Sequence, residues 1–379
     1  MKRYLLLCVG LFVVLCAAAQ SYEKLWSKYE DAFDDDKPKT ALSILQTIGR
    51  KAANEKNDGQ LIRSMIFTLQ VQEEISPDSL LPEVARLEAV MKKTKNPTSL
   101  VILQALLGRL YSMHDYDTLH YKRGVALLRK AMQDPALLAR ATTKDYQALF
   151  DIEEGSKYYN HDLLSVFMAD GAWKQAYRST AARANLRHQV IRYYRQQGNR
   201  NAALLATLDS IKAAPYPNDN ALRSARYATL MRVKEEFRDL PLNVLTYIAI
   251  INAPTTDEYE RDLTPLINLA KEGLTRYGKS ELSGELSNFL IRKNRAEVRF
   301  STNKGVYYPG EEIRLNVLSR NLKQAEVKVY RTNLTTDQLF SNRGRDDLLK
   351  IAKTGQLLQT LNKPLKHDVA YTWYKDSLF

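Results

Sequence analysis

The chain has 379 residues, of which 45% are hydrophobic, and carries a formal net charge of +13. This length exceeds an ordinary domain of roughly 100–200 residues, so two or three packed units are expected. The two cysteines, Cys8 and Cys16, lie close to the N-terminus. The rest of the chain therefore excludes disulfides, zinc–thiolate centres, cysteine nucleophiles and internal thioesters.

Residues 1–19 are typical of a secretory signal peptide. Lys2 and Arg3 precede an apolar run, and three consecutive alanines supply the small residues of a cleavage site. This pattern predicts cleavage at the end of the stretch and export to the periplasm or the cell surface. Lipid attachment at Cys16 is the alternative, but Leu15 stands where a lipoprotein signal usually has a small residue.

The basic charge balance does not by itself predict a nucleic-acid partner. Loss of Lys2 and Arg3 with the leader leaves a formal charge of +11, and the cations that remain are spread among acids, as in Lys271-Glu272. The densest basic cluster, at 292–295, ends a predicted helix, where cations offset the helix dipole. Solvated helix faces account for the charge, so we expect no polyanion partner.

Helical periodicity dominates residues 20–295, which begin with two short amphipathic helices. The acidic run 34–36 and the proline after it predict a turn and a second helix start. Two such helices joined by a few polar residues form an antiparallel hairpin. Their apolar faces consist of Tyr22, Trp26, Tyr29 and Phe33 in the first helix and of Ala41, Leu42, Leu45, Ile48 and Ala52 in the second.

A second hairpin is predicted over residues 187–211, RHQVIRYYRQQGNRNAALLATLDSI. The apolar residues around its Gly198-Asn199 turn, with small residues after the turn, resemble a tetratricopeptide (TPR) hairpin. The spacing departs from a regular repeat of about thirty-four residues, so we predict a degenerate helical-hairpin array. Connectors at 214–220 and 253–257 interrupt it, and the first separates two sub-blocks. Further helices are expected at 58–76, 79–92, 97–113, 119–132, 222–237, 259–276 and 280–293.

The hydrophobic period changes from helical to alternating after residue 295. Three consecutive runs alternate apolar and polar residues, which predicts antiparallel strands with one buried face. Pro309-Gly310 predicts a type II turn, because proline sets φ at the first central position and glycine tolerates a positive φ at the second. The residues expected on the buried face are Val298, Phe300, Ile313, Leu315, Val317, Ala325, Val327 and Val329.

The last part of the chain is expected to add an inserted helix at 335–352 and one or two more strands. About five strands then fit between Ala296 and Phe379, whereas a sandwich of ~100 residues has about seven. An unclosed sandwich exposes an unpaired strand edge, which is an aggregation hazard. We therefore expect residues 296–379 to form an incomplete antiparallel β-sandwich, with the chain truncated within it.

The order of elements is similar to that in the N-terminal part of large α2-macroglobulin-like proteins of Bacteroidetes-type bacteria. It consists of a leader, a long helical region and the stretch YYPGEEIRLNVLSRNLKQAEVKVYRTNL (307–334). The segments DLLSVFMADGAWKQAYRS (162–179) and ELSNFLIRKNRAEVRFS (285–301) also resemble the helical part of that group. The resemblance implies a TPR-like region, 20–295, followed by the first macroglobulin-type β-sandwich, 296–379.

Members of this family entrap proteases, using a bait region and a Cys–Gln thioester in a Gly-Cys-x-Glu-Gln motif. No residue of this chain matches that motif. The resemblance therefore implies a non-catalytic segment of an endopeptidase inhibitor, whose partners are proteases or other cell-envelope proteins. The alternative is a free-standing exported binding protein whose helical groove holds a peptide or a glycan.

A search for chemistry-bearing spacing predicts no catalytic, cofactor-binding or metal-binding residue, and no enzyme. The histidines lack the i, i+4 pairing of a helical metal site, although His114 and His120 flank Asp115 and Asp117. The acidic run 34–36 lacks the spacing of a calcium loop. Phosphate-binding glycine motifs and a G-x-S-x-G nucleophile motif are absent from the sequence.

Tyrosine is abundant, with 22 residues and pairs at 158–159, 193–194 and 307–308. Tyrosines in a helical array can line a ligand groove, but more often they pack between helices with their hydroxyl groups at the rim. We favour packing.

Overall fold

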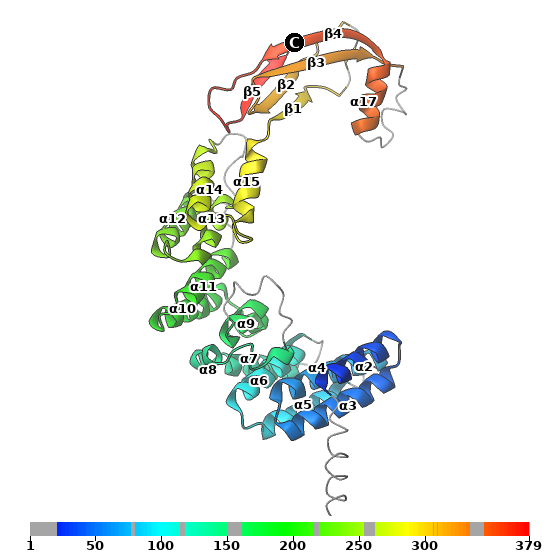
Figure 1. The fold of residues 1–379 in the computed structure, drawn as a ribbon, viewed down its shortest axis with the longest axis vertical. Coiled ribbons are helices and arrows are strands. Elements are labelled where there is room, and N and C mark those ends of the chain that lie inside the picture. Colours follow the sequence, from blue (N-terminus) through cyan, green and yellow to red (C-terminus); the bar gives the residue numbers. More distant parts are fainter. Residues whose placement is uncertain are drawn as a thin grey trace, which may run out of the picture. The chain divides into compact units, whose positions relative to one another are not determined.

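The computed structural model describes residues 21–76, 80–113, 118–149, 161–214, 220–253, 262–305, 307–308, 310–333 and 345–378. These residues fall into two compact units divided between Ser210 and Ile211. Helices make up the first unit, and helices followed by antiparallel strands make up the second (Figure 1). The predicted fold class, mainly α with a C-terminal antiparallel β part, is thereby confirmed. The predicted signal peptide lies outside the described residues.

Side-chain caps and prolines fix the starts of several helices in the first unit. Ser21, Asn57 and Asp162 each accept a hydrogen bond from the backbone N–H three residues further on. Pro38 and Pro135 stand in the first helical turn, where the missing N–H has no intrahelical partner to lose. The elements are α2 (Tyr22–Asp34), α3 (Pro38–Glu55), α4 (Asp58–Ile75), α5 (Leu80–Lys93), α6 (Pro97–Met113), α7 (Thr118–Ala131), α8 (Pro135–Arg140), η2 (Gln147–Leu149), α9 (Leu163–Asp170), η4 (Ala172–Gln175), α10 (Thr180–Gln196) and α11 (Arg200–Ala213), the last of which crosses the division.

Helix α3 packs against both α2 and α4 through small and branched side chains. Ala41 and Ile48 of α3 are fully buried, and they share one core with Trp26 of α2 and Val71 of α4. Because these side chains are short, α3 lies close to its two neighbours. The first predicted hairpin is confirmed, and α2 and α4 are left to meet each other through longer side chains.

The second unit starts with helices and ends with two small sheets. Its elements are α12 (Asn220–Glu236), η5 (Pro241–Asn243), α13 (Val244–Ile251), α14 (Thr264–Tyr277), α15 (Gly284–Asn294), β1 (Glu297–Thr302), β2 (Leu315–Arg320), β3 (Gln324–Arg331), α17 (Arg345–Thr354), β4 (Gln356–Pro364) and β5 (Tyr374–Leu378). Among the described helices of either unit, none combines the length and apolar character needed to cross a membrane.

The strands form one three-stranded sheet, in the order β1-β2-β5, and one two-stranded sheet, β3-β4, all antiparallel. Gly310 has φ +90°, and the backbone N–H of Glu311 donates to the carbonyl oxygen of Tyr308 at 3.0 Å. This agrees with the predicted turn, although Pro309 lies outside the described residues. Val317 of β2 and Leu365 after β4 form a small core between the sheets.

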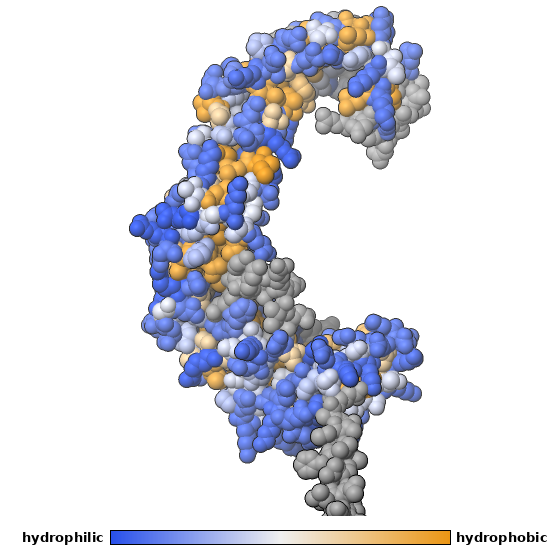
Figure 2. Space-filling model, viewed as in Figure 1, coloured by the Kyte–Doolittle hydropathy of each residue, from blue (hydrophilic) through white to orange (hydrophobic). Residues whose placement is uncertain are grey.

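The expectation that the alternating apolar residues form one buried face is wrong for several of them. Val298 and Phe300 of β1 are 39% and 47% exposed, and Val329 of β3 is 40% exposed. A three-stranded and a two-stranded sheet cover only part of each other, so the outer strands keep apolar side chains at the surface. Figure 2 shows such side chains in orange on the strand-bearing part.

Asn321 joins α15, the helix before the first strand, to the strands of the second unit. It lies between β2 and β3 with φ +55°, a conformation that asparagine tolerates better than most residues. Its side-chain amide donates to the carbonyl oxygens of Lys293 at 2.8 Å and Arg295 at 3.2 Å, and its Oδ1 accepts from the N–H of Tyr371 at 2.9 Å. One side chain thus connects the end of α15 with the loop before β5.

Candidate functional site

Helices α2 and α4 run parallel and meet through aromatic side chains. Trp26 of α2 donates from Nε1 to Oε1 of Gln60 at 2.7 Å, and further along both helices Tyr29 meets the ring of Phe67 edge-on, with centroids 5.3 Å apart. Since the contacts advance in the same direction along both helices, their carboxyl ends lie at the same end of the pair. That end carries Asp34 of α2 and Glu74 of α4.

A groove of about 580 Å³ opens between these two helices. Its volume falls in the range of roughly 300–1,000 Å³ that is usual for ligand pockets. Three aromatic rings form its apolar part, and carboxylates and an amide surround them. The lining residues are Tyr29, Glu30, Phe33, Asp34, Phe67, Gln70, Glu73 and Glu74, which we call the α2–α4 groove.

The carboxylates of the α2–α4 groove occupy an electrostatically unfavourable place. Asp34 and the pair Glu73-Glu74 lie in the last turns of their helices, where the helix dipole is negative, and neither last turn contains a basic residue. Within the described stretches, none of the four groove carboxylates forms an ion pair. A bound cation would therefore relieve repulsion that the folded chain leaves uncompensated.

Tyr29 brings a polar group to the bottom of the groove. The residue is only 3% exposed, and its ring packs against Trp26, Phe33 and Phe67. In the part of the chain that the structure describes, no group hydrogen-bonds its hydroxyl. Burial raises the pKa of this phenol to about 12, and the negative charges of Glu74 and Glu30 add to the effect.

A guanidinium already lies on the same set of rings. Arg63 of α4 stacks over Trp26, with its central carbon 4.1 Å from the ring centroid, and lies 5.4 Å from the centroid of Phe67. The positive charge of Arg63 lowers the pKa of Tyr29, against the larger effects of burial and the acids. The aromatic surface between α2 and α4 is therefore compatible with a flat cation.

A second groove, of about 420 Å³, lies between α3, α4 and α5, but its acid is already paired. Glu83 is nearly buried and contacts Nη1 of Arg86 at 3.0 Å. Ser64 donates from Oγ to the carbonyl oxygen of Leu61 at 2.7 Å. Because these polar groups have partners within the chain, this groove indicates a ligand less clearly than the α2–α4 groove does.

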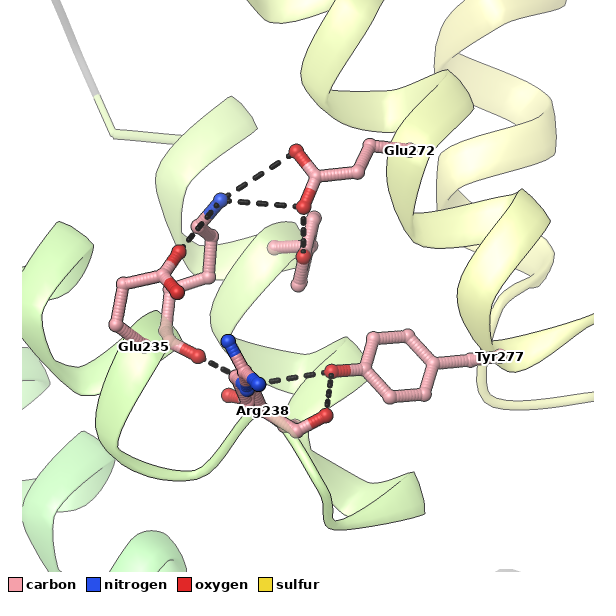
Figure 3. A network of polar contacts seen from close by, with 7 residues as sticks. Glu235, Arg238, Glu272 and Tyr277 are labelled. Atoms are coloured by element: carbon pink, nitrogen blue, oxygen red, sulfur yellow. Dashed lines mark hydrogen bonds and ion pairs between the residues drawn. The ribbon is translucent and has the colours of Figure 1, made fainter.

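A polar network in the second unit joins α12, α13 and α14 (Figure 3). Lys234, whose side chain is 8% exposed, contacts Glu235 at 3.1 Å and Glu272 at 3.2 Å. Tyr247 donates to Oε1 of Glu272 at 2.6 Å. Burial opposes the charge on Glu272, but hydrogen bonds from Tyr247 and Lys234 outweigh it and hold the pKa of that carboxyl below its usual value.

The remaining members of this network are Asn243 and Tyr277, and the buried Oδ1 of Asn243 has no hydrogen-bond partner among the described residues. The Asn243 amide donates to the carbonyl oxygen of Lys234 at 2.8 Å and to the Tyr277 hydroxyl at 3.1 Å, and Tyr277 donates to the carbonyl oxygen of Arg238 at 3.1 Å. These bonds join η5 to α12 and to α14, and α14 to the turn after α12. We therefore assign the network to holding the helices together.

The structure does not assemble the histidines into a site. His120 packs against the ring of Tyr111, while His161 and His367 contact a threonine hydroxyl and a backbone carbonyl. His114, Asp115 and Asp117 lie outside the described residues. Among the described residues, no group of three or more His, Cys, Asp or Glu side chains is placed to hold a metal ion.

The acidic run and the tyrosine pairs have separate places. Asp35 pairs with Lys37 at 2.8 Å, and Asp34 alone of the run lines the α2–α4 groove. Tyr194 is buried and hydrogen-bonded, as packing predicts, and Tyr308 is 75% exposed. The pair at 158–159 lies outside the described residues.

The sequence reasoning missed the groove carboxylates. A usable signal was present, because Glu30 and Asp34 are four residues apart on one helix face and both helices end without a basic residue. Comparison of the chain with models of protein families, with curated proteins and with solved structures finds no match.

Proposed function

We propose that the chain is a non-catalytic, exported interaction protein, the helical scaffold and first β-rich part of an α2-macroglobulin-like protease inhibitor. The observation that carries this proposal is the junction after α15, where antiparallel strands and a 308–311 turn directly follow a helical array. Helix-then-strand order and this turn are the features on which the resemblance rests.

The helical region supports a binding role in physical terms. An array of packed helices offers grooves between its members, and the α2–α4 groove places aromatic rings beside carboxylates that form no ion pair among the described residues. Aromatic residues are enriched where proteins bind other proteins, and charged groups at the edge of a binding surface contribute to the choice of partner. In this proposal the partners are proteases or other proteins of the cell envelope.

The α2–α4 groove also favours a second candidate, a free-standing exported protein that binds a peptide. A glycan is the other ligand of this candidate, because carboxylates and an amide beside aromatic rings can also hydrogen-bond and stack on a sugar. In this candidate the strands are an accessory to the helical region.

Both candidates can be tested with the chain from which residues 1–19 have been removed. It is mixed with active-site-blocked serine, cysteine and metalloproteases, and complexes are detected by size-exclusion chromatography with light scattering. We expect a complex with at least one protease and no hydrolysis of peptide or ester substrates by the chain alone. Hydrolysis by the purified chain would overturn the non-catalytic role, and binding of peptides without binding of any protease would favour the second candidate.

A further inference from the structure

We infer that the α2–α4 groove binds an arginine-bearing segment of a protein partner, with the guanidinium on the aromatic floor and the rim carboxylates around it. This inference deepens the proposed function, on which it rests, by naming the chemistry that the helical region recognises. The observations that carry it are the carboxylates without ion pairs, the aromatic rings, and the mostly buried Tyr29, whose hydroxyl has no hydrogen-bond partner among the described residues.

A cation is the ligand that the rim selects. Glu30 and Asp34 are four residues apart on α2, and the Glu73-Glu74 pair faces them from the parallel end of α4. Like charges at such spacing repel one another, and the two negative helix ends add to the repulsion. A positively charged group in the groove removes both costs at once.

The geometry favours a planar organic cation over a metal ion. Among the described side chains, no three carboxylates converge as a metal ion requires. A guanidinium instead needs an aromatic face and carboxylates around its edge, and the groove supplies both. Arg63 is an example from the same aromatic cluster, since its guanidinium carbon lies 4.1 Å from the ring centroid of Trp26 and 5.4 Å from that of Phe67, which lines the groove.

Tyr29 supplies the remaining polar contact. Its side chain is almost completely buried, yet its hydroxyl has no hydrogen-bond partner within the described part of the chain. Tyr29 lines the groove, and an N–H of an entering guanidinium can donate to its hydroxyl oxygen. The groove thus offers an arginine one neutral oxygen in addition to the carboxylates.

The test uses the chain without residues 1–19. The peptide acetyl-Gly-Arg-Gly-Arg-Gly-amide is titrated into it by isothermal titration calorimetry. An otherwise identical peptide with citrulline in place of arginine keeps the shape and removes the charge. We expect the arginine peptide to bind one site per chain and the citrulline peptide to bind at least about tenfold more weakly. Binding should also weaken between about 20 and about 150 mM NaCl, because the rim is exposed to solvent.

A pair of matched variants locates the site. Glu30→Gln with Asp34→Asn removes two charges from the groove face of α2, and we expect about a tenfold loss of affinity. Glu23→Gln with Asp31→Asn removes the same charge from the same helix outside the groove, and we expect less than about a twofold loss. Tyr29→Phe keeps the ring and should weaken binding by several-fold through loss of the hydroxyl.

Other outcomes would overturn the inference. No binding of the arginine peptide, or equal losses in the groove and control variants, would do so. Equal competition by spermidine or Mg²⁺ would assign the rim to general cation attraction and would also reject it. If proteases bind the Glu30→Gln, Asp34→Asn chain as well as they bind the unmodified chain, the proposed function stands and this inference alone fails. If the arginine peptide binds while no protease does, this inference stands and the proposed function fails.

Discussion

Gly108 of α6 and Gly124 of α7 face each other so closely that a Cβ at position 124 would lie 2.8 Å from the carbonyl oxygen of Gly108. The same atom would lie 2.9 Å from Cβ of Tyr111 and 3.0 Å from the backbone N of Ser112. Backbone atoms cannot move aside as a flexible side chain can. The two helices therefore pack at a distance that only glycine permits at this position.

Gly124→Ala is expected to destabilise the first unit by about 2–3 kcal/mol, because the added methyl group forces α6 and α7 apart. Thermal unfolding followed by circular dichroism measures the effect. Gly198→Asn is the matched control. No atom lies within 4 Å of a Cβ at Gly198, and asparagine tolerates its positive φ, so the loss should stay below about 0.5 kcal/mol. Equal losses in the two variants would contradict the close packing.

The Tyr29 phenol is expected to ionise near pH 12, later than an ordinary tyrosine, because burial and the nearby carboxylates Glu74 and Glu30 oppose the phenolate. The measurement is the absorbance at the phenolate band after a rapid pH jump, as the difference between the unmodified chain and Tyr29→Phe. Since the folded-state pKa is raised, the contribution of this group to stability is complete below pH 10 and is lost as the pH rises towards 12. A titration midpoint near 10 in the difference absorbance would show that water solvates the Tyr29 hydroxyl and that burial does not raise its pKa.

Glu272→Gln is expected to destabilise the second unit by about 1–2 kcal/mol, because it leaves the nearly buried Lys234 with only the exposed Glu235. Tyr247→Phe should cost about 1 kcal/mol, since it removes one hydrogen bond to Glu272. Because the folded-state pKa of Glu272 is lowered, the contribution of its carboxylate to stability is present above the ordinary pKa of glutamate. That contribution is lost as the pH falls through the lowered pKa. Urea unfolding at neutral and acid pH measures both effects, and the difference between Glu272→Gln and the unmodified chain should shrink in acid.

Tyr194→Phe is expected to destabilise the first unit by about 1–3 kcal/mol. The Tyr194 hydroxyl donates to Oδ1 of the buried Asp162 at 2.8 Å, and Asp162 caps α9 by accepting from the N–H of Ser165 at 2.7 Å. Tyr193→Phe is the neighbouring control. Within the described residues Tyr193 has no hydrogen-bonded hydroxyl, so its loss should be below about 0.5 kcal/mol. A larger loss of unfolding free energy for Tyr193→Phe than for Tyr194→Phe, measured by urea unfolding, would contradict a stabilising hydrogen bond between Tyr194 and Asp162.

Helix positions in this chain could be predicted well because apolar spacing and start signals agree. The helix expected at 97–113 is α6, Pro97–Met113, and the one expected at 119–132 is α7, Thr118–Ala131. The second was located to within one residue, but the apolar pattern does not indicate that Gly124 makes the close contact with α6. A glycine inside a helical pattern indicates a close approach only when the facing helix is known.

Strand boundaries and burial were harder to predict, because they depend on partners distant in the sequence. Ile313 was expected within a strand, but β2 begins at Leu315, where pairing with Thr302 begins, and Ile313 is 52% exposed. Alternation predicts which residues share a face, and the facing sheet decides whether that face is covered. The α2–α4 groove was missed for the same kind of reason, since the parallel course of its helices depends on α3.

The order β1-β2-β5 predicts an order of strand pairing during folding. β1 and β2 can pair through their short connection as soon as both exist, but β5 reaches the other edge of β2 only after β3, α17 and β4 have been passed. Closing this large loop has an entropic cost that the adjacent helical hairpins of the chain do not incur. We therefore expect the central strand to gain its second neighbour last, and an unpaired strand edge of this kind can pair with another chain until β5 arrives.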